Sequence, residues 1–327
     1  MNTLQAKSDI DPIFLDDDRV STFPSMYPTI TAITEKQRGC IWGVKEIDFR
    51  DDATQWATLD EDEQKFITGI LAFFAGSDLI VNKNLITRFM QDVKPYEFQA
   101  MYRIQTFMED IHSEVYARLL HVYVSDDNER KKLFNAIKTV PIVKEKAAWA
   151  EKWIATDRPY KERLIAFAAV EGILFSGSFC AIFWIRETKK KLKALTISND
   201  YISRDEGLHV DGAVEIHKLL RDKASETIAH EIIKEAVELE GKFISEILPK
   251  KLIGINASSM LEHIKFVANR LLRQLGYASL YPNITESPFA FMNSICLTQK
   301  SNFFEVTATQ YNQLASNNDD DPWKFDV

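Results

Sequence analysis

The sequence contains two Glu-x-x-His pairs, Glu109 with His112 and Glu206 with His209, whose side chains could bind a divalent metal ion. An α-helix turns about 100° per residue, so residues three apart lie on one face, about one turn from each other. Each pair then offers a carboxylate oxygen and an imidazole nitrogen, which is a chelating arrangement for a divalent cation. One such pair is a weak signal, because chance alone can produce it in 327 residues with six histidines.

Two further carboxylates, Asp78 and Glu171, each lie within an otherwise apolar run. An unpaired buried carboxylate costs several kcal/mol, so Glu171 is hard to explain without a partner. Four carboxylates neutralise two divalent cations, whereas the same four groups without cations would repel one another or take up protons. Oxygen donors with one imidazole per metal favour Fe(II) or Mn(II), and no thiolate is present to favour zinc or copper. Singly, each side chain could be a hydrogen-bonded core residue; together the six predict a dinuclear site.

Tyr116 lies one turn beyond His112 and on the same helical face. Most tyrosines in such positions are core residues. Beside a dinuclear centre that activates oxygen, however, a phenol is the side chain most easily oxidised by one electron. Phe175 and Phe179, one and two turns beyond Glu171, could shield this phenol from water.

Helices must position these side chains, because the hydrophobic pattern has the period of α-helices and strand-like alternation is nearly absent. We predict about eight long helices. The first of them begins at a capping-box sequence, Thr58 to Glu61, and the helix with the second Glu-x-x-His pair begins at a polar N-cap region, Ser198 to Asp200. The helices that carry the six residues, and two that follow, are expected at about 58–90, 96–124, 164–185, 198–220, 225–248 and 256–276.

One acid from each of two helices, with a Glu-x-x-His pair from each of two others, is the arrangement of ferritin-like dinuclear carboxylate proteins. We therefore predict an all-α fold, a ferritin-like helical bundle with a dinuclear carboxylate metal site. The expected organisation is an N-terminal arm with short helices at 1–52, the helical domain at 53–296 and a flexible tail at 297–327.

The net charge of −8 and a pI near 5.4 argue against nucleic acid and anionic membranes as partners. Three widely spaced cysteines do not form a disulfide framework, and the polar N-terminus has no export signal, so we expect a cytoplasmic protein. Residues 164–185 could span a bilayer by length, with Glu171 as their only charged side chain. A carboxylate near the middle of a lipid-facing span is costly, so we expect a buried core helix and no membrane partner.

The sequence around these residues resembles the small subunit of class I ribonucleotide reductase over roughly residues 40–311. The matching runs are 72–78, 108–116, 170–179, 202–209 and 300–305, the last followed by Tyr311. The resemblance implies two iron ions, with manganese as the alternative. It places Asp78, Glu109 and His112 largely on one metal, and Glu171, Glu206 and His209 on the other.

In that family, O2 reacts with the reduced metals, and the tyrosine that matches Tyr116 loses an electron and a proton. The stored radical is then passed to a cysteine of a separate large subunit, which reduces ribonucleotides. Trp42 matches the family's relay tryptophan, and Asp205 matches the acid that links it to His112. This is physically reasonable, since a ligating histidine usually donates its other N–H to a carboxylate. Tyr311 matches the tyrosine that relays the radical across the subunit interface.

The resemblance also implies an apolar pocket around the radical, formed by Ile202 with Phe175 and Phe179. The acidic segment 319–327 ends the chain with two aromatic residues, Trp323 and Phe325, which we expect to dock on the large subunit. A homodimer is expected on the same grounds.

Three other functions use similar residues. A ferritin-like ferroxidase needs the same six ligands but neither the Trp42 relay nor the aromatic tail. A di-iron oxygenase or desaturase needs an open pocket at the metals and tolerates Tyr116→Phe. A non-catalytic binding homologue is disfavoured because all six ligands are present. Asp78 and Tyr116 also disfavour the manganese–iron form without a tyrosine, which has Glu and Phe there, and the four carboxylates disfavour a metal-independent form.

Overall fold

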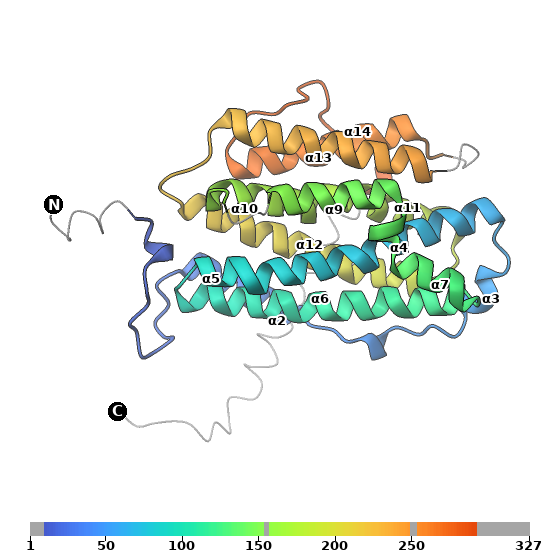
Figure 1. Cartoon of the computed structure of the whole chain (residues 1–327), viewed down its shortest axis with the longest axis horizontal. Coiled ribbons are helices and arrows are strands. Elements are labelled where there is room, and N and C mark those ends of the chain that lie inside the picture. Colours follow the sequence, from blue (N-terminus) through green and yellow to red (C-terminus); the bar gives the residue numbers. More distant parts are fainter. Residues whose placement is uncertain (1–9, 154–156, 249–253, 293–327) are drawn as a thin grey trace, which may run out of the picture. The chain divides into compact units, whose positions relative to one another are not determined.

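The computed structural model describes residues 10–153, 157–248 and 254–292, and within these ranges the chain is helical and contains no β-strand (Figure 1). The predicted all-α class is therefore confirmed. The helices belong to one compact unit that ends at Pro288. The longer α-helices are α2 (Pro28–Gly39), α4 (Glu61–Asn84), α6 (Tyr96–Tyr123), α9 (Pro141–Trp153), α10 (Tyr160–Ala169), α11 (Ser176–Lys189), α12 (Lys193–Leu219), α13 (Glu226–Ile247) and α14 (Ala257–Leu275). The short helical elements are two 3-10 helices, η1 (Pro12–Phe14) and η2 (Val44–Glu46), and the α-helices α3 (Asp52–Trp56), α5 (Met90–Asp92), α7 (Asp127–Phe134) and α8 (Ala136–Thr139).

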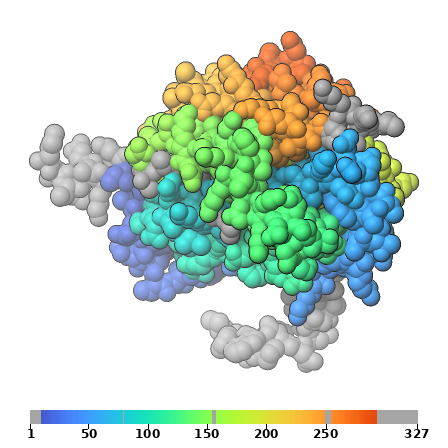
Figure 2. Space-filling view, turned by 45° about the vertical axis from the view of Figure 1, so that its right-hand side comes forward, coloured from blue at the N-terminus to red at the C-terminus, as the bar shows by residue number. Residues whose placement is uncertain are grey.

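The core of the bundle contains three packed layers of helices. Helices α4 and α6 run side by side, and the Asn82 amide of α4 donates a hydrogen bond to Asp110 of α6 at 2.8 Å. In Figure 1, α10 and α11 lie between this pair and the pair α13–α14. Helices α7 to α9 pack on α4, and α9 also packs on α13. The atoms of α7 to α9 are green in Figure 2 and occupy the front of that view, between blue and orange regions.

The central apolar segment is not the continuous α-helix that the sequence predicts. A five-residue π-helical turn, η4 (Val170–Leu174), separates α10 from α11, and a second π-helical turn, η3 (Leu85–Phe89), follows α4. By length and composition alone, Glu61–Asp92 and Tyr160–Lys189 could each cross a membrane. The most apolar 18-residue window of the second is 94% buried inside the protein, so its side chains contact other helices. This burial is what we expect of a core helix.

Local capping signals locate most helix ends. The last two helices lie at the predicted positions, where Ser225 and Asn256 cap α13 and α14 and Gly276 ends α14 with a φ of 88°. The predicted capping box of α4 is shifted by two residues. Asp60, not Thr58, accepts the N–H of Glu63 at 2.8 Å, because the Thr58 hydroxyl instead donates to the carbonyl of Gln55 in α3.

The predicted start of α12 near residues 198–200 is wrong, because the helix begins at Lys193. Its first turn is capped by a distant side chain. Asp52 of α3 is fully buried and accepts the N–H groups of Ala194 and Leu195 at 3.0 and 3.2 Å. The phenol of Tyr123 donates to the same carboxylate at 2.6 Å. A carboxylate at a helix N-terminus also interacts favourably with the helix dipole.

Replacing Asp52 by Ala is expected to lower the free energy of unfolding by about 2–4 kcal/mol, since it removes a helix cap and leaves buried donors without an acceptor. Urea unfolding followed by circular dichroism measures this change. The matched control is Asp51→Ala, because Asp51 is exposed and makes no side-chain cap. Equal stability of the two variants would contradict the role of Asp52.

Candidate metal centre

The six predicted ligand side chains come together inside the bundle, each at most 3% exposed. Four separate helical elements carry them, and these elements are far apart in the sequence. Asp78 lies on α4, Glu109 and His112 on α6, Glu171 on the π-helical turn η4, and Glu206 and His209 on α12.

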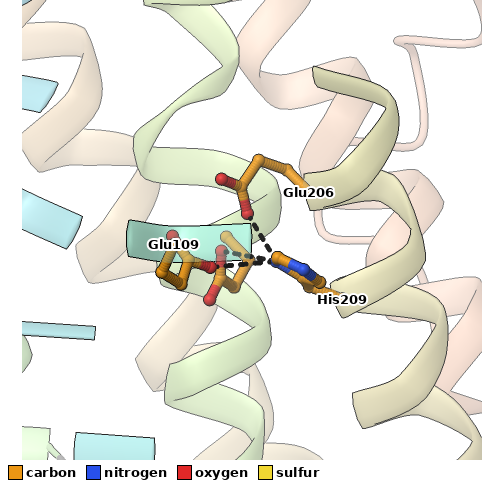
Figure 3. Close-up of side chains that lie close together, drawn as sticks. Glu109, Glu206 and His209 are labelled. Atoms are coloured by element: carbon orange, nitrogen blue, oxygen red, sulfur yellow. Dashed lines mark hydrogen bonds and ion pairs between the residues drawn. The ribbon is translucent and has the colours of Figure 1, made fainter. Parts of the chain in front are cut away.

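The side chains form two groups that share Glu109. Potential ligand atoms of Glu109, Glu171, Glu206 and His209 lie within 4.8 Å of one another, as do those of Asp78, Glu109 and His112. His209 Nδ1 lies 2.9 Å from Glu206 Oε2 and 3.1 Å from Glu109 Oε1 (Figure 3). His112 Nδ1 lies 3.2 Å from Glu206 Oε1 and 3.4 Å from Glu109 Oε2. Glu109 and Glu206 therefore lie between the two histidines, where a carboxylate can bridge two ions.

Several buried polar atoms of this cluster make no hydrogen bond: Asp78 Oδ2, both oxygens of Glu109, His112 Nδ1 and Glu171 Oε2. Buried polar atoms are rarely left in this state, because they have lost their hydration without a replacement. All of them are oxygen or imidazole donors of the kind that bind Fe(II) or Mn(II). The residues thus fit a pair of divalent cations.

Electrostatics supports the same interpretation. Burial raises the pKa of Asp78 and of Glu171, and neighbouring carboxylates raise both further. Burial alone would lower the pKa of His112 and His209, but hydrogen bonds and charges of the carboxylates outweigh it and raise both values. The cluster therefore concentrates negative charge, which retains protons unless cations take their place.

A hydrogen-bond chain leads from the cluster to Trp42. Asp205 Oδ2 lies 3.2 Å from His112 Nε2 and accepts the indole N–H of Trp42 at 2.7 Å. The Trp42 and His112 rings are stacked, with centroids 6.1 Å apart. Arg204 donates to the other oxygen of Asp205 at 3.0 Å and to the carbonyl of Cys40 at 2.6 Å. This arrangement turns His112 Nδ1 toward the carboxylate cluster.

Gln105 belongs to the same buried region and was not predicted from the sequence. It is 1% exposed, and its amide donates to Glu171 Oε1 at 3.3 Å. The available signal is its position four residues before Glu109, on the same face of α6. Such a contact fixes the orientation of a carboxylate that could bind a metal.

Tyr116 is 3% exposed and packs face to face on Phe74, with ring centroids 4.7 Å apart. Phe74 in turn contacts Phe175 and Phe179, at centroid distances of 5.5 and 5.1 Å. Sequence reasoning missed Phe74, although it lies four residues before Asp78 and so shares its helical face. Burial raises the pKa of Tyr116, and the nearby carboxylates raise it further. Its phenol is therefore protonated at neutral pH.

Ile202 of α12, also assigned to the pocket, is fully buried. Three other assigned residues, Tyr311, Trp323 and Phe325, lie outside the described residues, as does the whole predicted tail at 297–327.

The fold and the cluster together define a ferritin-like protein with a dinuclear carboxylate centre. The family model described as ribonucleotide reductase, small chain, matches residues 19–288, and the chain belongs to this family. It is 46% identical over 298 residues to the ribonucleoside-diphosphate reductase small chain of Nicotiana tabacum, covering 91% of this chain and 90% of that one. It is also 46% identical over 297 residues to subunit M2 of Mesocricetus auratus, covering 90% and 76%.

Solved structures agree with this assignment. The Rnr4 homodimer of Saccharomyces cerevisiae is similar with a TM-score of 0.80 and 32% identity, covering 94% of this chain and 95% of that chain. A putative class I ribonucleotide reductase from Bacillus halodurans, at 24% identity, has the same fold with a TM-score of 0.76, covering 82% and 100%.

Proposed function

We propose that this chain is the radical-storing small subunit of a ribonucleoside-diphosphate reductase. The observation that carries the proposal is the buried connection from His112 through Asp205 to Trp42. A metal-storage protein, or an oxygenase acting on its own substrate, does not need this connection, in which Trp42 is hydrogen-bonded to Asp205 and Asp205 contacts His112. Membership of the small-chain family supports the same function.

The six side chains described above would hold two iron ions, with manganese as the alternative. When bound and reduced, the metal pair would react with O2 and supply the oxidant for Tyr116. Glu109 would contribute to both metal positions, because it belongs to both groups of side chains, and Gln105 and Asp205 orient Glu171 and His112 from outside.

Tyr116 would store the oxidising equivalent by losing one electron and its phenolic proton. Phe74 stacks on the Tyr116 ring, Phe175 and Phe179 pack against Phe74, and the buried position of Tyr116 excludes water. Exclusion of water protects a radical from reduction by solutes. Burial and the neighbouring carboxylates raise the pKa of Tyr116, so the phenol holds its proton until it is oxidised.

Transfer to the large subunit would begin at Trp42. Its indole N–H donates to Asp205, so the carboxylate can hold the proton when Trp42 loses an electron. We propose that Tyr311 continues this path and that the tail at 297–327 docks through Trp323 and Phe325. The reaction at the large subunit would convert ribonucleotides to deoxyribonucleotides.

The rival functions are less well supported. A di-iron oxygenase would need an open pocket at the metals, yet the six ligand side chains are at most 3% exposed. A ferroxidase would use the same ligands but would not need Trp42, which is itself 4% exposed and held by Asp205.

We further propose a homodimer, located in the cytoplasm. Ile86 lies in η3 and Phe107 in α6, two elements that pack against each other. Both are about half exposed, at 52% and 51%. The similarity to the Rnr4 homodimer supports this proposal, and we propose that these two side chains lie in the interface. Light scattering of the purified chain measures its mass directly.

The function is tested by mixing the iron-loaded chain with its large subunit and measuring deoxyribonucleoside diphosphate formation. Product is expected only when both proteins and the metal are present. Product formed by the metal-free chain, or by the large subunit alone, would contradict the proposal.

A further inference from the structure

Lys146 and Glu240 form a buried ion pair beside the metal centre that is not part of it. Lys146 lies on α9 and Glu240 on α13, and their side chains are 1% and 0% exposed. The Lys146 ammonium lies 2.6 Å from Glu240 Oε2. It also lies over the rings of Phe73 and Phe243, 3.3 and 4.0 Å from their centroids. Replacing such a pair by apolar residues is often neutral for stability, so stability alone does not explain it.

The remaining contacts of this pair are with the backbone at the end of η4. The Lys146 ammonium donates to the carbonyl of Leu174, the last residue of the π-helical turn, at 2.7 Å. Glu240 Oε1 accepts the N–H of Gly177, in the first turn of α11, at 3.1 Å. The pair therefore binds a carbonyl on one side of the junction between η4 and α11 and an N–H on the other.

Gly177 permits the close approach of Glu240. A Cβ atom at this position would lie 2.5 Å from Glu240 Oε1 and 2.7 Å from a side-chain carbon of Ile244. Any larger residue would displace the Glu240 carboxylate and the Ile244 side chain and so disturb the contact with the Gly177 N–H.

The turn itself is buried, and Lys146 reaches its end beside a hollow of about 20 Å³ that Val170 and Leu174 also line. The hydrogen bonds of the pair fix the backbone at this end of the turn. Glu171, the ligand that η4 carries, lies three residues before Leu174.

We propose that the Lys146–Glu240 pair is a positioning device that holds the π-helical turn and thereby places the Glu171 carboxylate for metal binding. This inference rests on the proposed dinuclear site. The pair does not touch the metals or the radical; it acts through the backbone of residues 174–177.

The test compares two double variants that remove the buried charges together. Lys146→Met/Glu240→Leu removes both backbone contacts, whereas Lys146→Met/Glu240→Gln keeps an acceptor for the Gly177 N–H. The matched control is Lys242→Met/Glu145→Leu. Lys242 and Glu145 also pair at 2.6 Å and join α13 to α9, but they are 49% and 48% exposed. Mn(II) binding is measured by electron paramagnetic resonance titration, and folding by thermal melting.

The Met/Leu variant is expected to melt near the parent temperature but to bind Mn(II) roughly 10–100-fold more weakly, as is typical when support for a metal ligand is lost. The Mn(II) affinity of the Met/Gln variant should lie between those of the Met/Leu variant and the parent, and the control should match the parent.

Parental Mn(II) affinity in a folded Met/Leu variant would overturn the inference and leave the proposed function intact. If that variant does not fold, parental Mn(II) affinity in the Lys146→Met/Glu240→Gln variant would also overturn the inference. A parent that binds neither Mn(II) nor Fe(II) would overturn both.

Discussion

The Tyr116→Phe variant is expected to form no tyrosyl radical after addition of Fe(II) and O2, and to lose reductase activity to background. Phenylalanine keeps the ring that stacks on Phe74 at 4.7 Å but lacks the hydroxyl whose proton and electron are removed. Nearly isosteric substitutions in a core usually cost less than about 1.5 kcal/mol, so the fold should persist. Metal binding should be unchanged, since Tyr116 is not among the six ligands.

Electron paramagnetic resonance of the parent and the variant, with metal analysis of both, is the decisive comparison. Tyr123→Phe is the matched control, because Tyr123 is also buried on α6 but bonds to Asp52. This control should keep its radical despite some loss of stability. An unchanged signal in Tyr116→Phe would place the radical on another residue. No radical in an iron-loaded parent would bring forward manganese, or the ferroxidase and oxygenase functions.

Deleting residues 323–327 is expected to abolish reductase activity while leaving the Tyr116 radical intact. Aromatic residues at the centre of an interface often contribute 2 kcal/mol or more each. Loss of Trp323 and Phe325 together should then weaken binding to the large subunit by about 10²–10³-fold. Neither residue is needed for metal binding, which the helices provide.

Surface plasmon resonance with the immobilised large subunit measures this affinity, and activity is assayed in parallel. Lys324→Ala is the control, because Lys324 lies between the two aromatic residues and is expected to contribute little. A peptide of residues 319–327 should inhibit the parent by competition. Full activity after the deletion would instead favour a function that needs no large subunit.

Local patterns in the sequence determined the helical class and singled out the six residues of the buried cluster. Glu109 with His112, and Glu206 with His209, are three residues apart, so any helix places each pair on one face. Carboxylates within apolar runs singled out Asp78 and Glu171, because burial of an unpaired charge is costly. Helix ends with their own capping residues, such as Asn256 for α14, were also predictable. The structure brings the six side chains together as this pattern predicts.

Only the tertiary structure decided features that depend on residues far apart in the chain. Helix α12 begins at Lys193 because Asp52, far earlier in the sequence, accepts its first N–H groups. The π-helical turn around Glu171 likewise has no local signal, and its end is bound by Lys146 and Glu240 from two other helices. A hydrophobic period reports which face of a helix is buried, but it does not report which distant polar group satisfies its backbone. That choice is made only when the helices pack.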